Sequence, residues 1–437
     1  MTIILRLVEL CEVCRYMTLK IYRSVLIIAD DFTGANDTIA QFAKLGFSTI
    51  TTLDIDIVPE LMKKYDVVAV DTESRALDAE KAYKLLLSLG NKIKEYANQT
   101  VFYKKIDSTL RGNITSEIRG LYDALRPDLI VFAPAFPKQG RTTKEGILMV
   151  KGVPVEKTYF GKDMRTPVRS SVLSSYFKVD FKGSYHHTSL DALRAGRIID
   201  DINSVKVMSF DVENDEDLKA IVQNIGKLDN KKIIWIGSAG LAENVAYYTI
   251  VGSQRGKPIL MVVGSANDLV REQVRVFVEE FSARILTVKI DALINNFEEE
   301  SKRLEDEVSK ALVTSSDIVI TISYSQEQIR EGELMAQSLN IELSDFGLIL
   351  AKRFGVLVSR LISHFGWNRF GGLFITGGDI AISTIKSLGV DTLELRGEIE
   401  PGLPILKFKD KNIVTKAGGF GTMETLIKIA ARLKIER

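Results

Sequence analysis

The sequence has few of the residues that metal and redox sites usually need. Its 437 residues include only two cysteines and three histidines. Cys11 and Cys14 form a single C-x-x-C pair, which supplies half of a structural zinc site, and there is no second pair. Their surroundings lack the strand–helix pattern of a redox motif, so we interpret residues 1–23 as an amphipathic N-terminal extension. The low cysteine content fits a cytoplasmic protein.

An excess of charge of one sign is also missing. The chain carries 58 Lys and Arg against 57 Asp and Glu, a formal net charge of +1, which gives no electrostatic case for a nucleic-acid partner. No apolar run reaches membrane-spanning length, so no membrane partner is expected either. The 46% hydrophobic and 26% charged composition is ordinary for a globular protein, and the length predicts more than one domain.

Short β-branched runs alternate with amphipathic patterns along most of the chain. Strands are expected at residues 25–29, 48–53, 67–71, 101–106 and 129–133, with helices at 38–45, 79–97 and 114–125 between them. Strands separated by helices predict βαβ units and a largely parallel sheet. Residues 136–182 break the pattern with prolines and glycines, which favours a functional segment over regular structure.

The stretch VGSQRGKP, residues 251–258, is the best candidate linker because Gly, Ser, charge and Pro separate two apolar blocks. The alternation then restarts, with strands expected from residue 259 to residue 416 and a last helix at 423–433. The predicted fold is therefore α/β with two domains, residues 24–252 and 258–437. Each has a largely parallel sheet flanked by helices, and we expect the active site in the cleft between them. A symmetric homodimer is the expected assembly.

Acidic residues follow the predicted strands of the first domain at their carboxyl ends. The stretch VLIIADDFTG runs into Asp30 and Asp31, and Asp71 and Asp107 stand at the same point after two other strands. Ligands of parallel sheets bind at this edge, so we expect these carboxylates to converge there. They can accept hydrogen bonds from sugar hydroxyls, or one can take a hydroxyl proton as a general base. Further candidates nearby are Thr33, Asn36, Asp37 and Ser108.

The same segments supply cationic side chains that can hold a carboxylate. These are Arg75, Lys104, Lys105, Arg111, Lys138 and Arg141. An edge that offers both charges suits a small hydroxy acid. For any single residue, a structural role is as good an explanation as a functional one. Asp37 could cap a helix, and the arginines could be solvated surface groups. The convergence of the whole set favours a functional site.

In the second domain, three glycine-containing turns follow expected strands and precede helices. They are VVGSAND, FITGGDIA and VTKAGGFGT. Glycines let backbone N–H groups approach oxyanions, and a helix N-terminus adds favourable charge, so the three turns together favour nucleotide binding. None of them matches a Walker A or GxGxxG motif. The predicted nucleotide-binding residues in these turns are Ser265, Asn267, Thr376, Gly377, Gly378, Asp379, Gly418, Gly419 and Gly421.

A charged edge in one domain and phosphate-type turns in the other are typical of a small-molecule kinase that closes on its substrates. Two alternatives stay open from the residues alone. One is a sugar-acid sensor that binds without catalysis. The other is a dinucleotide-dependent oxidoreductase, which the absence of a GxGxxG motif makes less favoured.

The motifs also resemble, in order, those of the four-carbon acid sugar kinases. They are IADDFTGAND, KKIDSTLRGN, APAFPKQGRTT, PVEKTYFGKDMRTPV, ITGGD and TKAGGFG. The resemblance runs from about residue 24 to the end. It implies an N-terminal domain for threonate, erythronate or a 3-oxo-tetronate and a C-terminal domain for ATP, with the terminal hydroxyl phosphorylated.

The resemblance also assigns residues to the two sites. Those implied to line the acid site are Asp30, Asp31, Thr33, Asn36, Asp37, Arg75, Asp107, Ser108 and Arg111. Those implied to line the nucleotide are Ser265, Gly377, Gly378, Asp379, Gly418 and Gly419. Asn267, Val270 and Ile380 depart from the usual family pattern, and the departures at Asn267 and Val270 keep the sensor alternative open.

These assignments lead to a mechanistic hypothesis. Asp31 or Asp30 would be the catalytic base, and Arg75 and Arg111 would hold the substrate carboxylate. Mg²⁺ would accompany ATP, with Asp379 as the candidate metal partner and helix capping as the alternative role of this residue.

Overall fold

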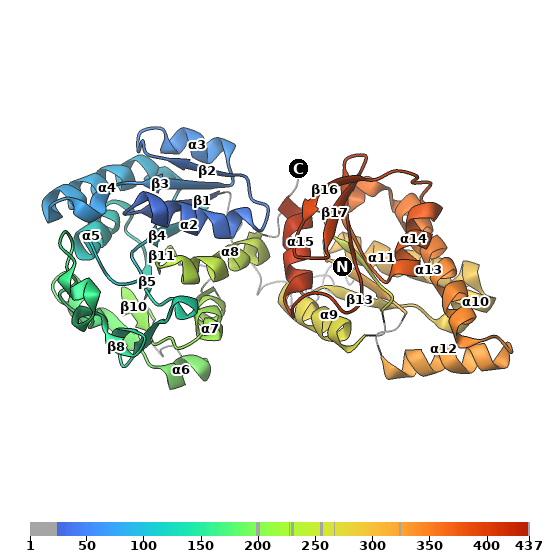
Figure 1. Ribbon diagram of the computed structural model, residues 1–437. Coiled ribbons are helices and arrows are strands. Elements are labelled where there is room, and N and C mark those ends of the chain that lie inside the picture. The colour runs from blue at the N-terminus through green and yellow to red at the C-terminus, as the bar shows by residue number, and fades with distance from the viewer. Residues whose placement is uncertain are drawn as a thin grey trace, which may run out of the picture. The chain divides into compact units, whose positions relative to one another are not determined.

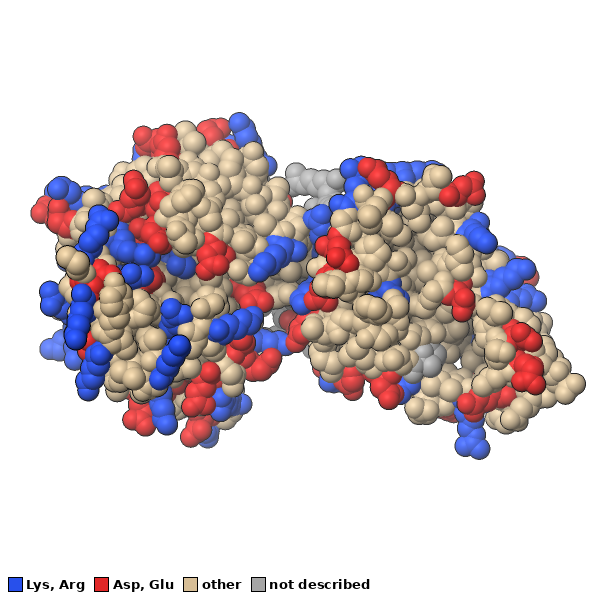
Figure 2. Space-filling view, viewed as in Figure 1, with Lys and Arg blue, Asp and Glu red and all other residues tan. Residues whose placement is uncertain are grey.

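The computed structural model describes residues 24–197, 202–226, 228, 231–253, 257–265, 267–322 and 325–435. The predicted N-terminal extension, with Cys11 and Cys14, lies outside these residues. The chain divides into two compact units, with the boundary between residues 254 and 255 (Figure 1). In the described ranges, no helix combines the length and the apolar character that a membrane span requires. Acidic and basic side chains are interspersed over the face seen in Figure 2.

The first unit is built on an eight-stranded sheet with the order β2-β3-β1-β4-β11-β5-β10-β9, in which every pairing is parallel. The strands are β1 (Ser24–Ala29), β2 (Thr49–Thr52), β3 (Val67–Asp71), β4 (Thr100–Lys105), β5 (Leu129–Ala133), β9 (Tyr185–Thr188), β10 (Val207–Phe210) and β11 (Ile233–Gly237). The helices are α2 (Phe32–Ala43), α3 (Val58–Lys64), α4 (Ala79–Ile93), α5 (Ile114–Leu125), α6 (Leu190–Arg194), α7 (Asp215–Gly226) and α8 (Ala239–Ser253).

The two faces of this sheet are covered by different helices. Helices α4 and α5 pack together on one face, over a core that includes Leu26, Phe102 and Ile118. Helix α2 packs against α8, and α8 against α7. Successive residues of a strand point to opposite faces, so each strand serves both layers. Because of this alternation, the neighbouring Lys104 and Lys105 at the end of β4 point to opposite faces of the sheet.

The second unit has a seven-stranded sheet with the order β13-β14-β12-β15-β18-β17-β16. Its strands are β12 (Leu260–Val263), β13 (Arg284–Thr287), β14 (Ile318–Thr321), β15 (Leu373–Thr376), β16 (Glu394–Glu398), β17 (Pro404–Phe408) and β18 (Lys411–Lys416). Its helices are α9 (Asp268–Phe281), α10 (Ile290–Asn295), α11 (Phe297–Val313), α12 (Gln326–Ser338), α13 (Leu343–Phe365), α14 (Gly378–Ser387) and α15 (Thr425–Ile435). The pairs from β13 to β18 are parallel, and β17 and β16 add antiparallel strands.

The two α/β units with largely parallel sheets confirm the predicted fold class. Several predicted elements differ in detail. The helix expected at 38–45 begins at Phe32, because Asp31 caps it, and the helix expected at 79–97 ends at Ile93. The segment 136–182, expected to be irregular, contains a small antiparallel sheet of β6 (Arg141–Lys144), β7 (Ile147–Val150) and β8 (Val153–Pro154).

Candidate active site

Three neighbouring strands bring acidic residues to the carboxyl edge of the first sheet. Strand β1 lies between β3 and β4, with Ala29 in register with Asp71 on one side and Lys105 on the other. Asp30 follows the end of β1, and Asp107 lies two residues beyond the end of β4. The predicted convergence of these segments therefore follows from the strand order.

Arg75 joins the two adjacent acids. Its Nε donates to Asp30 Oδ2 at 2.8 Å and its Nη2 to Asp30 Oδ1 at 3.0 Å, while Nη1 donates to Asp31 Oδ2 at 2.9 Å. Asp30 is 1% exposed, so this two-point ion pair satisfies both oxygens of a buried carboxylate. Burial opposes the charge, but hydrogen bonding to Asp30 raises the pKa of the Arg75 guanidinium.

Asp31 has a second role at the start of α2. Its Oδ1 accepts a hydrogen bond from the N–H of Gly34 at 3.1 Å, so it is the N-cap of this helix. Unlike Asp30, its side chain is 30% exposed. The capping bond and the ion pair with Arg75 fix the orientation of this carboxylate, and the exposure leaves it accessible to a ligand.

A second ion pair stands beside the first. Arg111 donates from Nε to Asp107 Oδ2 at 2.9 Å and from Nη2 to Oδ1 at 3.0 Å. Thr109 also donates its hydroxyl to Asp107. Burial opposes ionisation, but the bonds from Arg111 and Thr109 lower the pKa of Asp107. A Cβ added at Gly112 would lie 3.3 Å from Asp30 Oδ2, so this loop packs directly against the Asp30 pair.

Asp71 is a buried acid whose charge is not balanced by an ion pair with any described residue. It is 2% exposed, and the hydrogen bond that its side chain accepts comes from the N–H of Glu73 at 2.9 Å. Burial raises the pKa of Asp71, and the like charges of Glu73, Asp31 and Asp30 raise it further. We call Asp30, Asp31, Asp71, Arg75, Lys105, Asp107 and Arg111 the charged cluster.

The Asp71→Asn variant is expected to be more stable than the wild type at neutral pH. A raised pKa in the folded state means that the ionised carboxylate opposes folding above that pKa and stops doing so once protonated. The gain in melting temperature should therefore disappear as the pH falls below the ordinary Asp range. Thermal unfolding measured at several pH values tests this, and a variant that is less stable at neutral pH would contradict it.

Lys104 and Lys105 are neighbours in β4 but point to opposite faces. Lys104 lies on the α5 side, is 0% exposed, and forms an ion pair with Glu117 at 2.9 Å. Glu117 also accepts a hydrogen bond from Ser74 at 2.6 Å. The structure therefore places Lys104, predicted to bind substrate, in the core and outside the charged cluster. Lys105 reaches the acids instead, with Asp30, Asp31 and Asp107 as its electrostatic neighbours.

Three predicted residues on α2 have different surroundings. Thr33 is exposed in the first turn. Asn36 accepts a hydrogen bond from the hydroxyl of Thr51 at 3.0 Å, which ties α2 to β2. Asp37 is exposed on the same helix. Only Thr33 lies in the turn that Asp31 caps.

The cations predicted after β5 do not join the cluster. Strand β11 lies between β4 and β5, which displaces the segment that follows β5. Lys138 pairs with Glu243 at 2.7 Å, and Arg141 donates to the carbonyl oxygen of Gln139 at 2.7 Å. Ser108 is half-buried next to Asp107 and stays a candidate.

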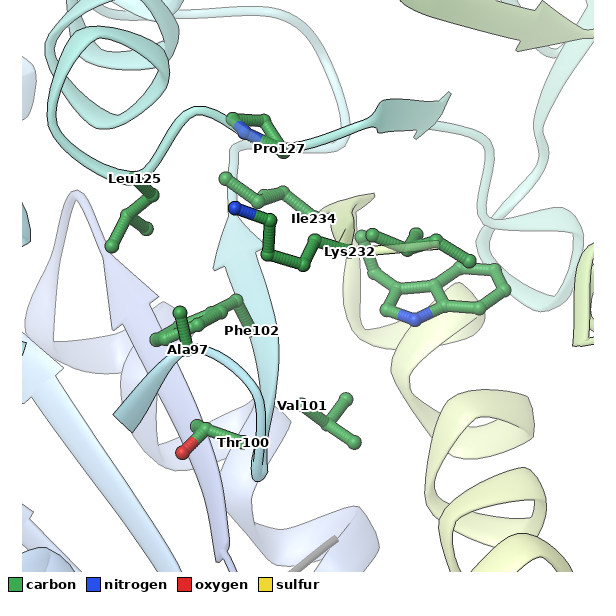
Figure 3. Close-up of a pocket in the computed structure, with 10 residues that line it drawn as sticks. Ala97, Thr100, Val101, Phe102, Leu125, Pro127, Lys232 and Ile234 are labelled. Atoms are coloured by element: carbon green, nitrogen blue, oxygen red, sulfur yellow. The ribbon is translucent and has the colours of Figure 1, made fainter. Parts of the chain in front are cut away.

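A small cavity lies at the opposite end of the first sheet. It is lined by the amino ends of β4 and β11, including Thr100, Val101 and Ile234 (Figure 3). Its volume of about 10 Å³ is close to the minimum for one water molecule, so it has no room for a substrate.

In the second unit, the three predicted glycine turns lie next to one another. They follow β12, β15 and β18, which are adjacent parallel strands. The N–H of Gly264 donates to the Thr376 carbonyl at 3.2 Å, and the N–H of Gly377 donates to the Lys416 carbonyl at 3.2 Å. A Cβ at Gly418 would collide with the Ser265 hydroxyl, so these two turns are in close contact.

The turn after β18 is held in place by two side chains that donate hydrogen bonds to its carbonyl groups. Lys416 Nζ donates to the carbonyl oxygens of Ala417, Gly418 and Phe420 at 3.2, 3.1 and 2.9 Å. Gln273 of α9 donates to the carbonyls of Phe420 and Thr422 at 3.3 and 2.7 Å. Because these carbonyl groups accept hydrogen bonds from the protein's own side chains, the N–H groups of the loop are available to a ligand.

Several backbone N–H groups of these turns have no acceptor within the described part of the chain. They belong to Gly418, Gly419, Gly421, Gly378 and Asp379. Gly377 has φ +102° and no side chain that could cap α14, so the N-terminus of this helix is open. Free N–H groups beside an uncapped helix N-terminus form an anion site suited to phosphate.

The other predicted nucleotide residues differ in accessibility. Asn267 caps α9 by accepting from the N–H of Leu269 at 2.9 Å, a structural role that accounts for its side chain. Asp379 is exposed in the first turn of α14. Thr376 is 0% exposed, and its hydroxyl has no partner among the described residues.

Raising the pH above about 8 is expected to weaken nucleotide binding. Burial lowers the pKa of Lys416 to about 8, and the neutral amine donates fewer hydrogen bonds to the loop. In the folded protein the pKa of Lys416 lies below the ordinary value of 10.5. As the pH rises between these two values, the folded state therefore becomes more stable relative to the unfolded state. Unfolding cannot explain weaker binding in this range. The test is ADP affinity measured across this pH range. Lys416→Met should bind about 10-fold more weakly and remove the dependence.

Two family models match successive parts of the chain. Residues 25–245 match a family model described as a sugar-binding N-terminal domain, and residues 260–426 match one described as a nucleotide-binding C-terminal domain. A D-threonate kinase of Salmonella typhimurium is 30% identical over 92% of this chain and 96% of its own length. A D-erythronate kinase of Heliobacterium modesticaldum is 29% identical, with 92% and 95% covered.

A solved structure also matches nearly the whole chain. A Bordetella bronchiseptica protein, described as a domain of unknown function with bound citrate in a domain-swapped dimer, is 27% identical with a TM-score of 0.72. The match covers 94% of this chain and 99% of that one. The family models define a protein with a sugar-binding and a nucleotide-binding domain, and the relatives that match nearly the whole chain are sugar acid kinases. The chain belongs to the four-carbon acid sugar kinase family, and it is an enzyme that transfers phosphate to a hydroxyl of a sugar acid.

Proposed function

We propose that this enzyme uses ATP and Mg²⁺ to phosphorylate the terminal hydroxyl of a four-carbon sugar acid, with D-threonate and D-erythronate as the first candidates. The names of the relatives at 30% and 29% identity support these two acids equally. A 3-oxo-tetronate kinase of Brucella melitensis, at 24% identity, makes the oxidised acid a third candidate. The observation that carries the proposal is the oriented, accessible carboxylate of Asp31 inside the charged cluster.

Asp31 is the proposed base. A hydroxyl must lose its proton as it attacks phosphorus, and a carboxylate within hydrogen-bond reach accepts it. Asp31 is 30% exposed, whereas the neighbouring Asp30 is 1% exposed and has both oxygens bonded to Arg75. This difference favours Asp31 over Asp30, between which the sequence alone does not choose. In this proposal Arg75 orients the two acids and does not hold the substrate.

The nucleotide phosphates are proposed to bind the open N–H groups of the turns after β15 and β18. These donors suit oxyanions and need no charged side chain in direct contact. Mg²⁺ takes most of its ligands from phosphate oxygens and water, so a single exposed carboxylate such as Asp379 fits its needs. When bound, the metal ion neutralises the charge that develops on the phosphates.

A coupled assay for ADP release tests the function. The purified enzyme is incubated with Mg·ATP and, separately, with D-threonate, D-erythronate and a 3-oxo-tetronate. ADP release that depends on one of these acids supports the proposal, and product analysis should place the phosphate on the terminal oxygen. Binding of an acid without ADP release under any of these conditions would favour a sensor instead.

A further inference from the structure

Lys105 differs from the other cations of the charged cluster because it has no partner. Its residue is 6% exposed, at the carboxyl end of β4. Among the described residues, its Nζ forms no ion pair or hydrogen bond. A buried ammonium group without an acceptor opposes folding, and burial indeed lowers the pKa of Lys105. Such an arrangement suggests that the acceptor is a ligand.

The nearby carboxylates are already matched to other cations. Asp30 and Asp31 bond to Arg75, and Asp107 bonds to Arg111. Each guanidinium therefore directs most of its donors to protein acids, whereas all three donors of Lys105 are available. The carboxylate of an incoming acid would find its strongest free partner at Lys105.

The start of α2 adds hydrogen-bond donors beside the Lys105 ammonium group, whose other charged neighbours are the carboxylates of Asp30, Asp31 and Asp107. A Cβ built on Gly34 would lie 2.6 Å from Nζ, so the side chain reaches the first turn of α2, a helix of 12 residues. The N–H groups of Phe32 and Thr33 precede the first intrahelical bonds and have no acceptor within the described residues. Lys105 and the positive end of this helix therefore point to the same space.

We propose that Lys105, with the N–H groups at the start of α2, receives the carboxylate of the sugar acid. The inference rests on the proposed function, because it takes the acid to be the ligand of the first unit. The carboxylate is the only ionised group that such an acid carries, and the open N–H groups for phosphate lie in the second unit. Gly34 belongs to the site because any side chain there would fill the space that Lys105 occupies.

The test uses the Lys105→Met variant, which keeps the length of the side chain and removes its charge. Calorimetric titration of the nucleotide-free enzyme with D-threonate and D-erythronate should show about 100-fold weaker binding. The KM for the acid should rise similarly, while the KM for ATP stays unchanged. The matched control is Lys138→Met, which removes a lysine that pairs with Glu243 outside the cluster and should leave acid binding as in the wild type.

A second measurement separates a binding lysine from a structural one. Because Lys105 has no protein partner, Lys105→Met should unfold at the same temperature as the wild type or higher. An unchanged affinity for the acid in Lys105→Met would overturn the inference. So would a fall in kcat alone, since it would assign Lys105 to the transferred phosphoryl group. A wild-type enzyme that phosphorylates none of the acids would overturn the proposed function itself, which is a different result.

Discussion

The Asp31→Asn variant is expected to lose about a thousandfold in turnover while it folds and binds nucleotide normally. The amide occupies the same space as the carboxylate but cannot accept the proton of the attacking hydroxyl. Asn is also as good an N-cap as Asp, so the hydrogen bond from the Gly34 N–H can persist and α2 should remain intact. Steady-state ADP release measures the loss, and titration with ADP checks the nucleotide site.

Asp37→Asn is the matched control for this experiment. It makes the same chemical change on the same helix, at an exposed position whose backbone lies beyond the capped turn. Its turnover should stay close to that of the wild type. If Asp31→Asn kept full turnover, Asp31 would not be the base, and an equal loss in both variants would point to a general electrostatic effect of the lost charges.

The Lys104→Met variant is expected to destabilise the first unit by about 3–5 kcal/mol. Lys104 and Glu117 are 0% and 1% exposed, and removal of the ammonium leaves a buried carboxylate with only the Ser74 hydroxyl as donor. Neither group reaches the charged cluster, so the variant that does fold should keep its KM for the acid. Chemical denaturation measures the stability, and the KM is measured below the unfolding transition.

A double variant distinguishes the burial of a charge from a loss of packing. Lys104→Met combined with Glu117→Leu replaces the ion pair by apolar groups, which is often neutral or stabilising, so much of the lost stability should return. Lys84→Met, at an exposed pair with Glu80, should change stability little. A double variant as unstable as Lys104→Met alone would show that shape, and not an unpaired charge, causes the loss.

The sequence was sufficient for the elements that depend on local patterns. Residues 67–71, 114–125 and 129–133 form the predicted strands and helix with unchanged bounds, because their apolar runs end at polar residues or proline. The carboxyl edge could be predicted as well, since acids stand directly after the strands. The convergence of Asp30, Asp71 and Asp107 follows from three strands that are also close in sequence.

Features that depend on strand order or on the face of a strand could not be predicted. The insertion of β11 between β4 and β5 involves residues far along the chain, so it gives no local signal, and the sequence alone groups Lys138 and Arg141 with the acids. Lys104 and Lys105 have the same chemistry, and only the register of β4 decides which one meets Glu117. The period-2 alternation of β4 was a usable signal, since Lys104 shares a face with the apolar Phe102 and Ile106.

The two lysines at the end of β4 have a practical consequence for variant libraries. In a library scored for both soluble yield and specific activity, substitutions at Lys104 should produce little protein, and what remains should be active. Substitutions at Lys105 should give normal yields of an enzyme that saturates poorly. Substitutions at these two neighbouring positions would then separate in a plot of soluble yield against specific activity. An assay of total activity alone would not distinguish them.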